Sequence, residues 1–379
     1  MLTRYDIAII GGGPAGASAA ITLARAGYAI LLLEAKASPH DTLCGEFLSP
    51  ECQGWLRQLG VAESVRALSP TTIRAASLIA DDNTRWAAPL PGLAWGLSRA
   101  KLDQALLQAA ATCGATVHER KSCVGVAGNL RDGFTLTTRR QGSAVTQMVQ
   151  ARVVIGAHGK RSTMDRTLGR AFLGQSYPLF AMKRHFRGAL PPEGVALCGF
   201  AGGYCGLGAI EGGLVNLCFL ADRRMFQRTQ HVQDFLTHLS RANPTLGAWL
   251  REAQALDEPW QSVGALRFGA KGCVERDVLL VGDAAGLIAP LAGDGIAMAL
   301  HSGWLCAQHA QSFLQGDSAS ESLKTNYTRA WGQTFLPRIR LAGWLQTLML
   351  RPLWMRMTLR LFQRAPSLGQ WMVTHTRGM

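Results

Sequence analysis

The first residues whose types and spacing could do chemistry form a glycine-rich loop, Gly11-Gly12-Gly13-Pro14-Ala15-Gly16. Apolar residues 5–10 precede it and Ala-rich residues 14–26 follow it, which predicts a strand and a helix on its two sides. In such a unit Gly11 permits the tight turn, Gly13 lets the backbone approach a pyrophosphate, and Gly16 lets helix and strand pack closely. The helix N-terminus then offers free amides to the phosphates. The loop predicts a dinucleotide site rather than a turn without a ligand.

A carboxylate stands where such a site needs one. Glu34 ends the next apolar run, residues 29–33. At the end of the second strand, a carboxylate accepts hydrogen bonds from the ribose hydroxyls and repels a 2′-phosphate. Glu34 therefore extends the predicted dinucleotide site.

A second glycine-rich block, VLLVGDAAGLIAPLAGDGIAMALHSG, covers residues 278–303. A predicted strand runs into Gly282-Asp283, a loop containing Pro290 follows, and Gly293, Gly295 and Ile296 stand at the start of a predicted helix. Amides at such a start suit negative charge on a bound group. A capping Asp in an ordinary turn explains Asp283 alone, but it does not explain the whole block.

Two further polar residues fall in a predicted strand, residues 179–186. Lys183 and His185 share one face of it by the period-two alternation of strands. That face could meet a phenol, with His185 as general base or Lys183 as a charge stabiliser. Solvent exposure of the same face is the alternative, and it is the more common reason for polar pairs on a strand. Glu211, in a glycine-rich turn, is more typical of a hairpin than of an acid catalyst.

These motifs need two kinds of sheet and a helical tail to position them. Short buried runs predict parallel strands around residues 5–10, 29–33, 153–156 and 278–281, whereas residues 180–220 alternate as in an antiparallel sheet. Pro337, Pro352 and Pro366 should mark helix starts or breaks in the tail. The sequence predicts an α/β protein with a doubly wound Rossmann-type domain (1–70, 95–175 and 265–317), an inserted antiparallel β-sheet substrate domain (71–94 and 176–264) and a basic C-terminal helical region (318–379).

The order of these segments, together with residues 99–109 and 153–166, resembles the FAD-dependent aromatic hydroxylases, or class A flavoprotein monooxygenases, over roughly residues 1–315. That superfamily also holds geranylgeranyl reductases and flavin-dependent halogenases. The resemblance implies that the first loop and Glu34 hold the ADP half of FAD and that Arg99 contacts the cofactor. It implies that Asp283 and residues 293–296 hold the ribityl chain and the isoalloxazine ring.

One short segment resembles the reductase branch in particular. Cys44-Gly45-Glu46 is similar to the Cys-Gly segment that lies against the flavin in that branch. Cys44 as a small buried apolar residue is an equal alternative.

The chain also departs from the family pattern. The turn that usually reads Ala-Asp-Gly is Ala157-His158-Gly159 here, which puts in doubt how nicotinamide or the pyrophosphate is managed near it. We expect His158 to be structural. A Trp-x-Trp-x-Ile-Pro segment is absent, which disfavours a halogenase. A second G-x-G-x-x-G after a strand is absent too, so NADH or NADPH should dock transiently or another protein should supply electrons.

The charge of the chain is uneven. Lys and Arg give a formal net charge of +14 at pH 7, and no acidic residue follows Glu321. Arg356, Arg360 and Arg364 share one helical face, opposite a face of apolar residues, Leu353, Trp354, Met357 and Leu361. A helix on an anionic membrane surface and a core-covering helix with a solvated Arg face fit this pattern equally. Nucleic acid fits less well, since no nucleic-acid-binding module is visible.

The cysteines and the longest uncharged apolar stretch of the tail indicate the cellular compartment. Nine scattered cysteines without metal-ligand spacing favour a reducing, cytoplasmic setting and disfavour a metal site. The uncharged residues 341–350 are about half the roughly 20 that a membrane span requires. We therefore expect a cytoplasmic protein, with peripheral membrane contact through the tail as the open alternative.

The resemblance ranks three functions. The first is an NAD(P)H-dependent monooxygenase that hydroxylates a small hydrophobic aromatic or polyketide-like substrate through a flavin hydroperoxide. The second is an ene-reductase of prenyl or polyene chains. The third is a flavoprotein electron carrier at a membrane surface.

Overall fold

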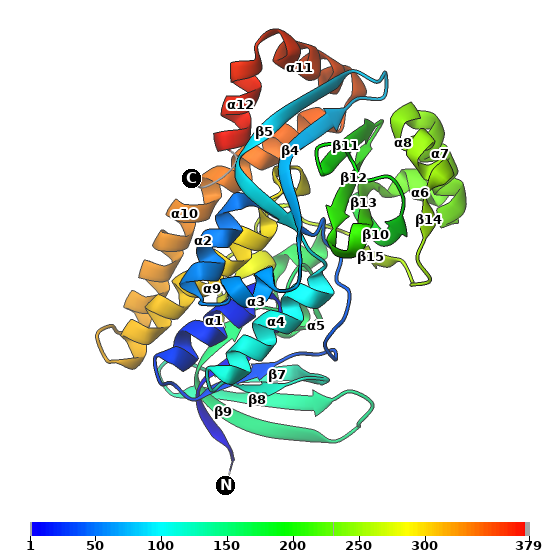
Figure 1. The fold of residues 1–379 in the computed structure, drawn as a ribbon. Helices are drawn as coiled ribbons and strands as arrows, with labels where there is room; N and C mark the ends of the chain where they lie inside the picture. The colour runs from blue at the N-terminus through cyan, green and yellow to red at the C-terminus, as the bar shows by residue number, and fades with distance from the viewer. Residues whose placement is uncertain (1, 230, 376–379) are drawn as a thin grey trace.

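The first of two large sheets carries the glycine-rich loop. The computed structural model describes residues 2–229 and 231–375, and its first sheet has the strand order β17-β18-β9-β1-β2-β6, with β7 and β8 joined through β9 (Figure 1). The pairs β1–β2, β1–β9, β2–β6 and β9–β18 are parallel. The predicted α/β fold with a Rossmann-type unit is confirmed. The strands are β1 (Arg4–Ile10), β2 (Ile30–Leu33), β6 (Thr116–His118), β7 (Lys121–Asn129), β8 (Gly133–Arg140), β9 (Thr146–Gly156), β17 (Val274–Glu275) and β18 (Val278–Leu280).

Helices α1 (Pro14–Arg25), α4 (Arg99–Thr112) and α9 (Gly295–Leu314) pack beside this sheet (Figure 1). Glycines set how closely they approach. A Cβ on Gly16 would lie 1.9 Å from the Gly11 carbonyl oxygen, and a Cβ on Gly303 would lie 2.1 Å from the Ala15 oxygen. Gly11 has a φ of +112°, a conformation that favours glycine. The contact at Gly303 packs α9 against α1, and the first residues of both helices lie beside the same space.

The second sheet holds both segments predicted as the insertion. Its order is β14-β10-β13-β12-β11-β4-β5-β3, with β15 paired to β10, and only β4 and β11 pair in parallel. Residues 71–96 and 179–263 thus contribute to one sheet, although the exact domain boundaries stay a prediction. Its strands are β3 (Phe47–Leu48), β4 (Thr71–Ile79), β5 (Arg85–Gly96), β10 (Leu179–Arg187), β11 (Val195–Phe200), β12 (Gly203–Ile210), β13 (Leu214–Asp222), β14 (Gln254–Ala255) and β15 (Gln261–Val263).

A separate apolar core lies between this sheet and three helices, α6 (Arg223–Thr229), α7 (Val232–Ala242) and α8 (Pro244–Glu252) (Figure 1). Phe180, Phe219 and Phe235 form its aromatic centre, with ring centroids 5.1 to 5.9 Å apart. Because these helices cover one face, the opposite face is left to line a site. The remaining elements are α2 (Pro50–Gln58), α3 (Ala62–Arg66), α5 (Thr163–Thr167), β16 (Gly269–Ala270) and β19 (Gly286–Leu287).

Three helices complete the chain: α10 (Ser320–Met349), α11 (Pro352–Arg364) and α12 (Pro366–His375). Pro352 and Pro366 begin helices, as predicted. The expectation of a start or break at Pro337 is wrong, since α10 continues through it. A proline removes only one backbone hydrogen bond, and here the long buried face of α10, which includes Phe335 and Ile339, holds the helix together.

The structure contradicts the interpretation of α11 as a core-covering helix with a solvated Arg face, whereas the membrane-surface interpretation stays a prediction. Arg356 binds Asp81 at 2.8 Å and Arg360 binds Asp82 at 2.9 Å, in the turn between β4 and β5. Most of the basic face is therefore paired within the protein. The apolar face predicted opposite it, Leu353, Trp354, Met357 and Leu361, is exposed. No helix of the described residues is both long and apolar enough to span a bilayer.

Candidate active site

A cavity of about 260 Å³ lies between the two sheets. One side comes from the loops at the carboxyl ends of the parallel strands, and the other from apolar residues of β10 to β13, among them Leu197 and Leu220. Loops at that edge of a parallel sheet are where such folds bind ligands. Most predicted cofactor-binding residues line this cavity: Gly13, Pro14, Ala15, Cys44, Gly45, Arg99, Asp283, Pro290, Gly293, Gly295 and Ile296.

The other three predicted residues lie directly behind the wall and shape it. Gly11 and Gly16 make the close backbone contact that forms the turn. The Glu34 carboxylate accepts hydrogen bonds from the Gly12 amide at 2.8 Å and from the Lys36 amide at 3.0 Å. Glu34 therefore lies against the glycine-rich loop, at the position from which a carboxylate reaches a ribose.

Arg99 places a cation beside this loop. A Cβ on Gly13 would lie 3.4 Å from the Arg99 guanidinium, so the two face each other. Asp103 accepts two hydrogen bonds from the Arg99 side chain, at 2.8 and 2.7 Å. Burial lowers the pKa of Arg99, but Asp103 raises it by more than burial lowers it, so the net pKa lies above its usual value. Arg99 is a permanent positive charge next to the place where a pyrophosphate would lie.

The second glycine-rich block supplies the opposite end of the cavity. Gly282 and Gly293 have φ values of +57° and +65°, and both turns lead the chain toward the start of α9. Asp283 lies 3.3 Å from the Lys160 ammonium. The first residues of α9 line the cavity, so the amides of its first turn, which have no partners within the helix, face the site. This arrangement fits the polar end of a flavin.

The segment around Cys44 is held in place from several sides. The Asn216 side chain donates to the Cys44 carbonyl oxygen at 2.9 Å, and Lys160 donates to the Leu43 oxygen at 2.9 Å. Glu46 has a φ of +55°, and its carboxylate accepts from the Arg99 amide at 2.9 Å. The backbone of residues 43–46 is thus fixed against the cavity.

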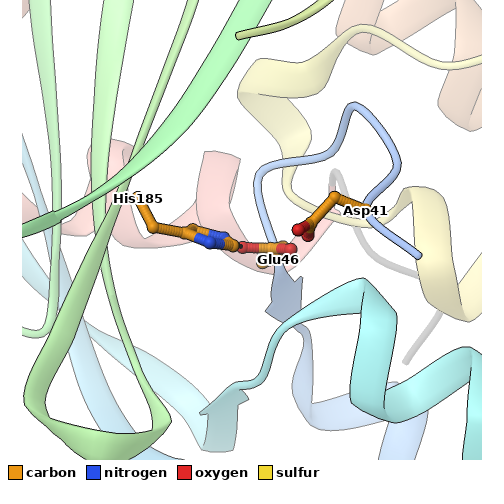
Figure 2. A group of neighbouring side chains, drawn as sticks. All are labelled: Asp41, Glu46 and His185. Carbon is orange, nitrogen blue, oxygen red and sulfur yellow. Dashed lines mark hydrogen bonds and ion pairs between the residues drawn. The ribbon is translucent and has the colours of Figure 1, made fainter. Parts of the chain in front are cut away.

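The two predicted catalytic residues meet this segment from behind. Lys183 contacts the Glu46 carboxylate and lies 3.0 Å from Asp41. The His185 Nε2 lies 2.6 Å from Glu46 (Figure 2). Their side chains are 0% and 6% exposed, so the alternative of a solvent-exposed face is wrong. Neither belongs to the described residues that line the cavity. Their catalytic role stays a prediction, and the geometry makes them residues that position Glu46.

Charge within this cluster is balanced by contact. Burial lowers the pKa of His185, but Glu46 on Nε2 and Glu258, 3.2 Å from Nδ1, raise it, and the net pKa lies above its usual value. Burial likewise lowers the pKa of Lys183, but Glu46 and Asp41 raise it by more, so the net pKa lies above its usual value. Lys183 and His185 thus lie among three carboxylates, those of Asp41, Glu46 and Glu258.

The same cluster has the composition of a metal site. Ligand atoms of Asp41, Glu46 and His185 lie within 4.8 Å of one another (Figure 2). The Lys183 ammonium already contacts Asp41 and Glu46 and approaches His185 to 3.2 Å. A built-in cation therefore holds these groups together, and we assign no metal to them.

His158, which replaces the family carboxylate, is paired within the protein, and its structural role stays a prediction. Its Nε2 lies 3.0 Å from Asp165, a buried carboxylate that also caps α5 through the Ser162 amide at 2.8 Å. Burial raises the pKa of Asp165, but its contact with His158 lowers it, and the net pKa lies below its usual value. Lys160 was not predicted from the sequence, although its position two residues after His158, in a turn at the strand end, was the available signal.

Comparisons with known proteins agree with this geometry. The chain matches the FAD binding domain family over residues 4–331 and belongs to that family. The menaquinone reductase of Mycolicibacterium smegmatis is 27% identical over 357 residues, covering 87% of this chain and 80% of that protein. The digeranylgeranylglycerophospholipid reductase of Methanosarcina mazei is 26% identical over 359 residues, covering 88% and 82%.

Solved structures show the same fold. The flavin-dependent brominase Bmp2 superposes with a TM-score of 0.82 at 19% identity, covering 99% of this chain and 93% of that one. A geranylgeranyl bacteriochlorophyll reductase-like protein from Thermoplasma acidophilum gives 0.81 at 21% identity, covering 95% and 91%. The chain is an FAD-dependent oxidoreductase, and the predicted superfamily is confirmed.

Proposed function

We propose that the chain is a flavin-dependent ene-reductase that saturates a carbon–carbon double bond in an isoprenoid chain. This ranks reduction above the hydroxylation that the sequence favoured. Both curated relatives described above are named as reductases, one of menaquinone and one of a digeranylgeranyl phospholipid.

The shape of the apolar space carries the proposal. A second cavity of about 80 Å³ shares four wall residues with the first, Ala76, Leu197, Leu291 and Ala292. It continues between β4, β5 and the C-terminal helices, where its wall includes Trp86 and Met349. A long apolar chain would extend through both spaces, with one double bond beside the flavin, whereas a single aromatic ring would use only the first.

The residues of the protein would bind and orient both FAD and the isoprenoid substrate. The glycine-rich loop, Glu34 and Arg99 would hold the ADP half of FAD, and Asp283 with the start of α9 would hold the flavin end. FAD held there in its reduced form would supply a hydride to one carbon of the double bond. The other carbon takes a proton, and Tyr204 and Cys44 are wall residues that carry one. Tyr204 is oriented by Gln346 at 3.2 Å.

Hydroxylation of a hydrophobic aromatic is the second candidate. The observation that favours it is the apolar wall of the flavin cavity, including Phe268 and Leu266, which would exclude water from a reaction with O₂. For either reaction, we propose that NADH or NADPH docks transiently to reduce the flavin.

Anaerobic turnover separates these candidates. FAD-loaded protein, reduced with dithionite under argon and freed of the excess, is mixed with a detergent-solubilised geranylgeranyl phospholipid, which has no quinone ring to accept the electrons. We expect the flavin to reoxidise and the lipid to gain two hydrogens by mass spectrometry. No reoxidation without O₂, together with an oxygen added to an aromatic compound in air, would overturn the proposal in favour of hydroxylation. Flavin that cycles only with a partner protein would identify an electron carrier.

A further inference from the structure

We propose that the C-terminal helices rest on an anionic lipid bilayer and that the second cavity admits the apolar chain from it. Exposed apolar side chains are concentrated there. Of the twelve large apolar side chains exposed in the described residues, seven belong to α10, α11 and α12: Trp344, Leu353, Trp354, Met357, Leu361, Leu368 and Trp371. Exposed apolar side chains on helices that contact one another, with aromatic residues among them, mark an interaction site.

Helix α11 shows how this surface is built. Leu353, Met357 and Leu361 follow one another at four-residue spacing, and they are 64%, 54% and 49% exposed. Another face of α11, with Met355, Leu359 and Phe362, is buried in the protein. The helix therefore has one apolar face packed inward and a second one turned outward.

Charge indicates what covers the outward face. Arg364 lies three residues after Leu361 on the same side of α11, and Arg351 directly precedes the helix. Both are exposed, and within the described part of the chain neither has an acidic partner at ion-pair distance. No acidic residue follows Glu321 in the sequence. Apolar and aromatic side chains bordered by arginines match the acyl and headgroup layers of an anionic membrane.

The second cavity lies directly beneath this surface. Thr358 lines it from α11, one turn after the exposed Trp354, and Leu348 lines it from α10. The same helices thus form the outward apolar face and the inner wall of the passage. Since the passage shares wall residues with the flavin cavity, a chain leaving the bilayer would reach the flavin without crossing water. This second part of the inference rests on the proposed function.

Vesicle binding tests the surface without any turnover. The FAD-loaded protein is sedimented with vesicles of phosphatidylglycerol and phosphatidylcholine, and with vesicles of phosphatidylcholine alone. We expect strong binding only to the first. Since each basic residue near an anionic surface contributes on the order of 1 kcal/mol, Arg351→Gln with Arg364→Gln should weaken binding by about thirty-fold. Trp354→Ser with Leu361→Ser should also weaken it.

Matched controls lie on the distant β7–β8–β9 sheet. Val145→Ser with Met148→Ser removes two apolar side chains that are more exposed than Trp354 and Leu361, and Arg131→Gln with Arg140→Gln removes two exposed charges. Both controls should bind as the unaltered protein does. The inference is overturned if that protein fails to bind the anionic vesicles, or if the tail variants bind them as well as the controls do. A dimer that dissociates on Trp354→Ser with Leu361→Ser, measured by light scattering, would overturn it in favour of a second copy.

Turnover then separates the surface from the reaction. When the isoprenoid lipid substrate is embedded in anionic vesicles, the variant with Trp354→Ser and Leu361→Ser should reduce it slowly. When the same lipid is dissolved in detergent, this variant should reduce it at the normal rate. Equal rates in both settings would refute the passage. If no lipid is reduced by any variant, the proposed function fails while the vesicle-binding result stands by itself.

Discussion

Replacing Lys183 by Met should destabilise the protein by about 3 kcal/mol. The side chain is fully buried, and its ammonium contacts the carboxylates of Glu46 and Asp41. Removing one partner of a buried ion pair costs about 3–5 kcal/mol because the other charge loses its compensation. We expect the lower end of this range, since Glu46 keeps His185 at 2.6 Å.

The assay is urea unfolding of the FAD-loaded protein at pH 7, followed by tryptophan fluorescence and by flavin release. A double-mutant cycle with Glu46→Gln isolates the pair. Because the double variant removes both charges together, it should lose less stability than the two single losses combined, with a coupling of about 2 kcal/mol. Lys101→Met is the control, since Lys101 is 47% exposed and lies 3.5 Å from Glu211. Its loss should be at most about 1 kcal/mol.

This account of the cluster would be refuted if the double variant lost as much stability as the two single variants together, within about 0.5 kcal/mol. So would a Lys183→Met protein that unfolds at the same urea concentration as the Lys101→Met control. In either case the buried charges would not be interacting as the geometry indicates.

Two further predictions concern the cofactor loop and the buried histidine. Gly16→Ala should yield protein without flavin absorbance, because its Cβ would lie 1.9 Å from a backbone oxygen, whereas Gly54→Ala, with no atom within 4 Å, should stay yellow. A yellow Gly16→Ala protein would contradict the tight turn. His185 has a raised pKa in the fold, so its charged form stabilises the protein below the unfolded pKa of about 6.5, and this contribution is lost as pH rises through the higher folded value. His185→Gln should lack that loss in unfolding curves measured against pH, and an unchanged pH profile would contradict it.

The cofactor loops could be predicted from the sequence because their chemistry is local. In Gly11 to Gly16, and again around Gly295, a few neighbouring residues determine both the turn and the exposed amides. The structure places both at one cavity. Their mutual approach depends on α1 packing against α9, and family resemblance rather than local pattern indicated it.

The buried charge cluster could not be predicted in the same way. Period-two alternation correctly placed Lys183 and His185 on one face of a strand, but it does not say what covers that face. The covering group is Glu46, which is 137 residues away from Lys183 in the chain. A contact of that separation leaves no local pattern.

The tail shows the same limit. Helical periodicity separated the arginines of α11 from its apolar residues, yet the partner of Arg356 is Asp81, 275 residues earlier. Once that distant turn binds the basic face, the apolar face is the one left exposed on the protein surface. The sequence thus defined two faces, and tertiary contacts decided their surroundings.

The contact between α1 and α9 has a consequence for biosynthesis. Since the flavin cradle needs the first turn of each helix, a nascent chain that has emerged only to residue 270 holds half of it. FAD should therefore be captured late, after the ribosome has released nearly the whole oxidoreductase, and the N-terminal βαβ unit must wait unliganded until then.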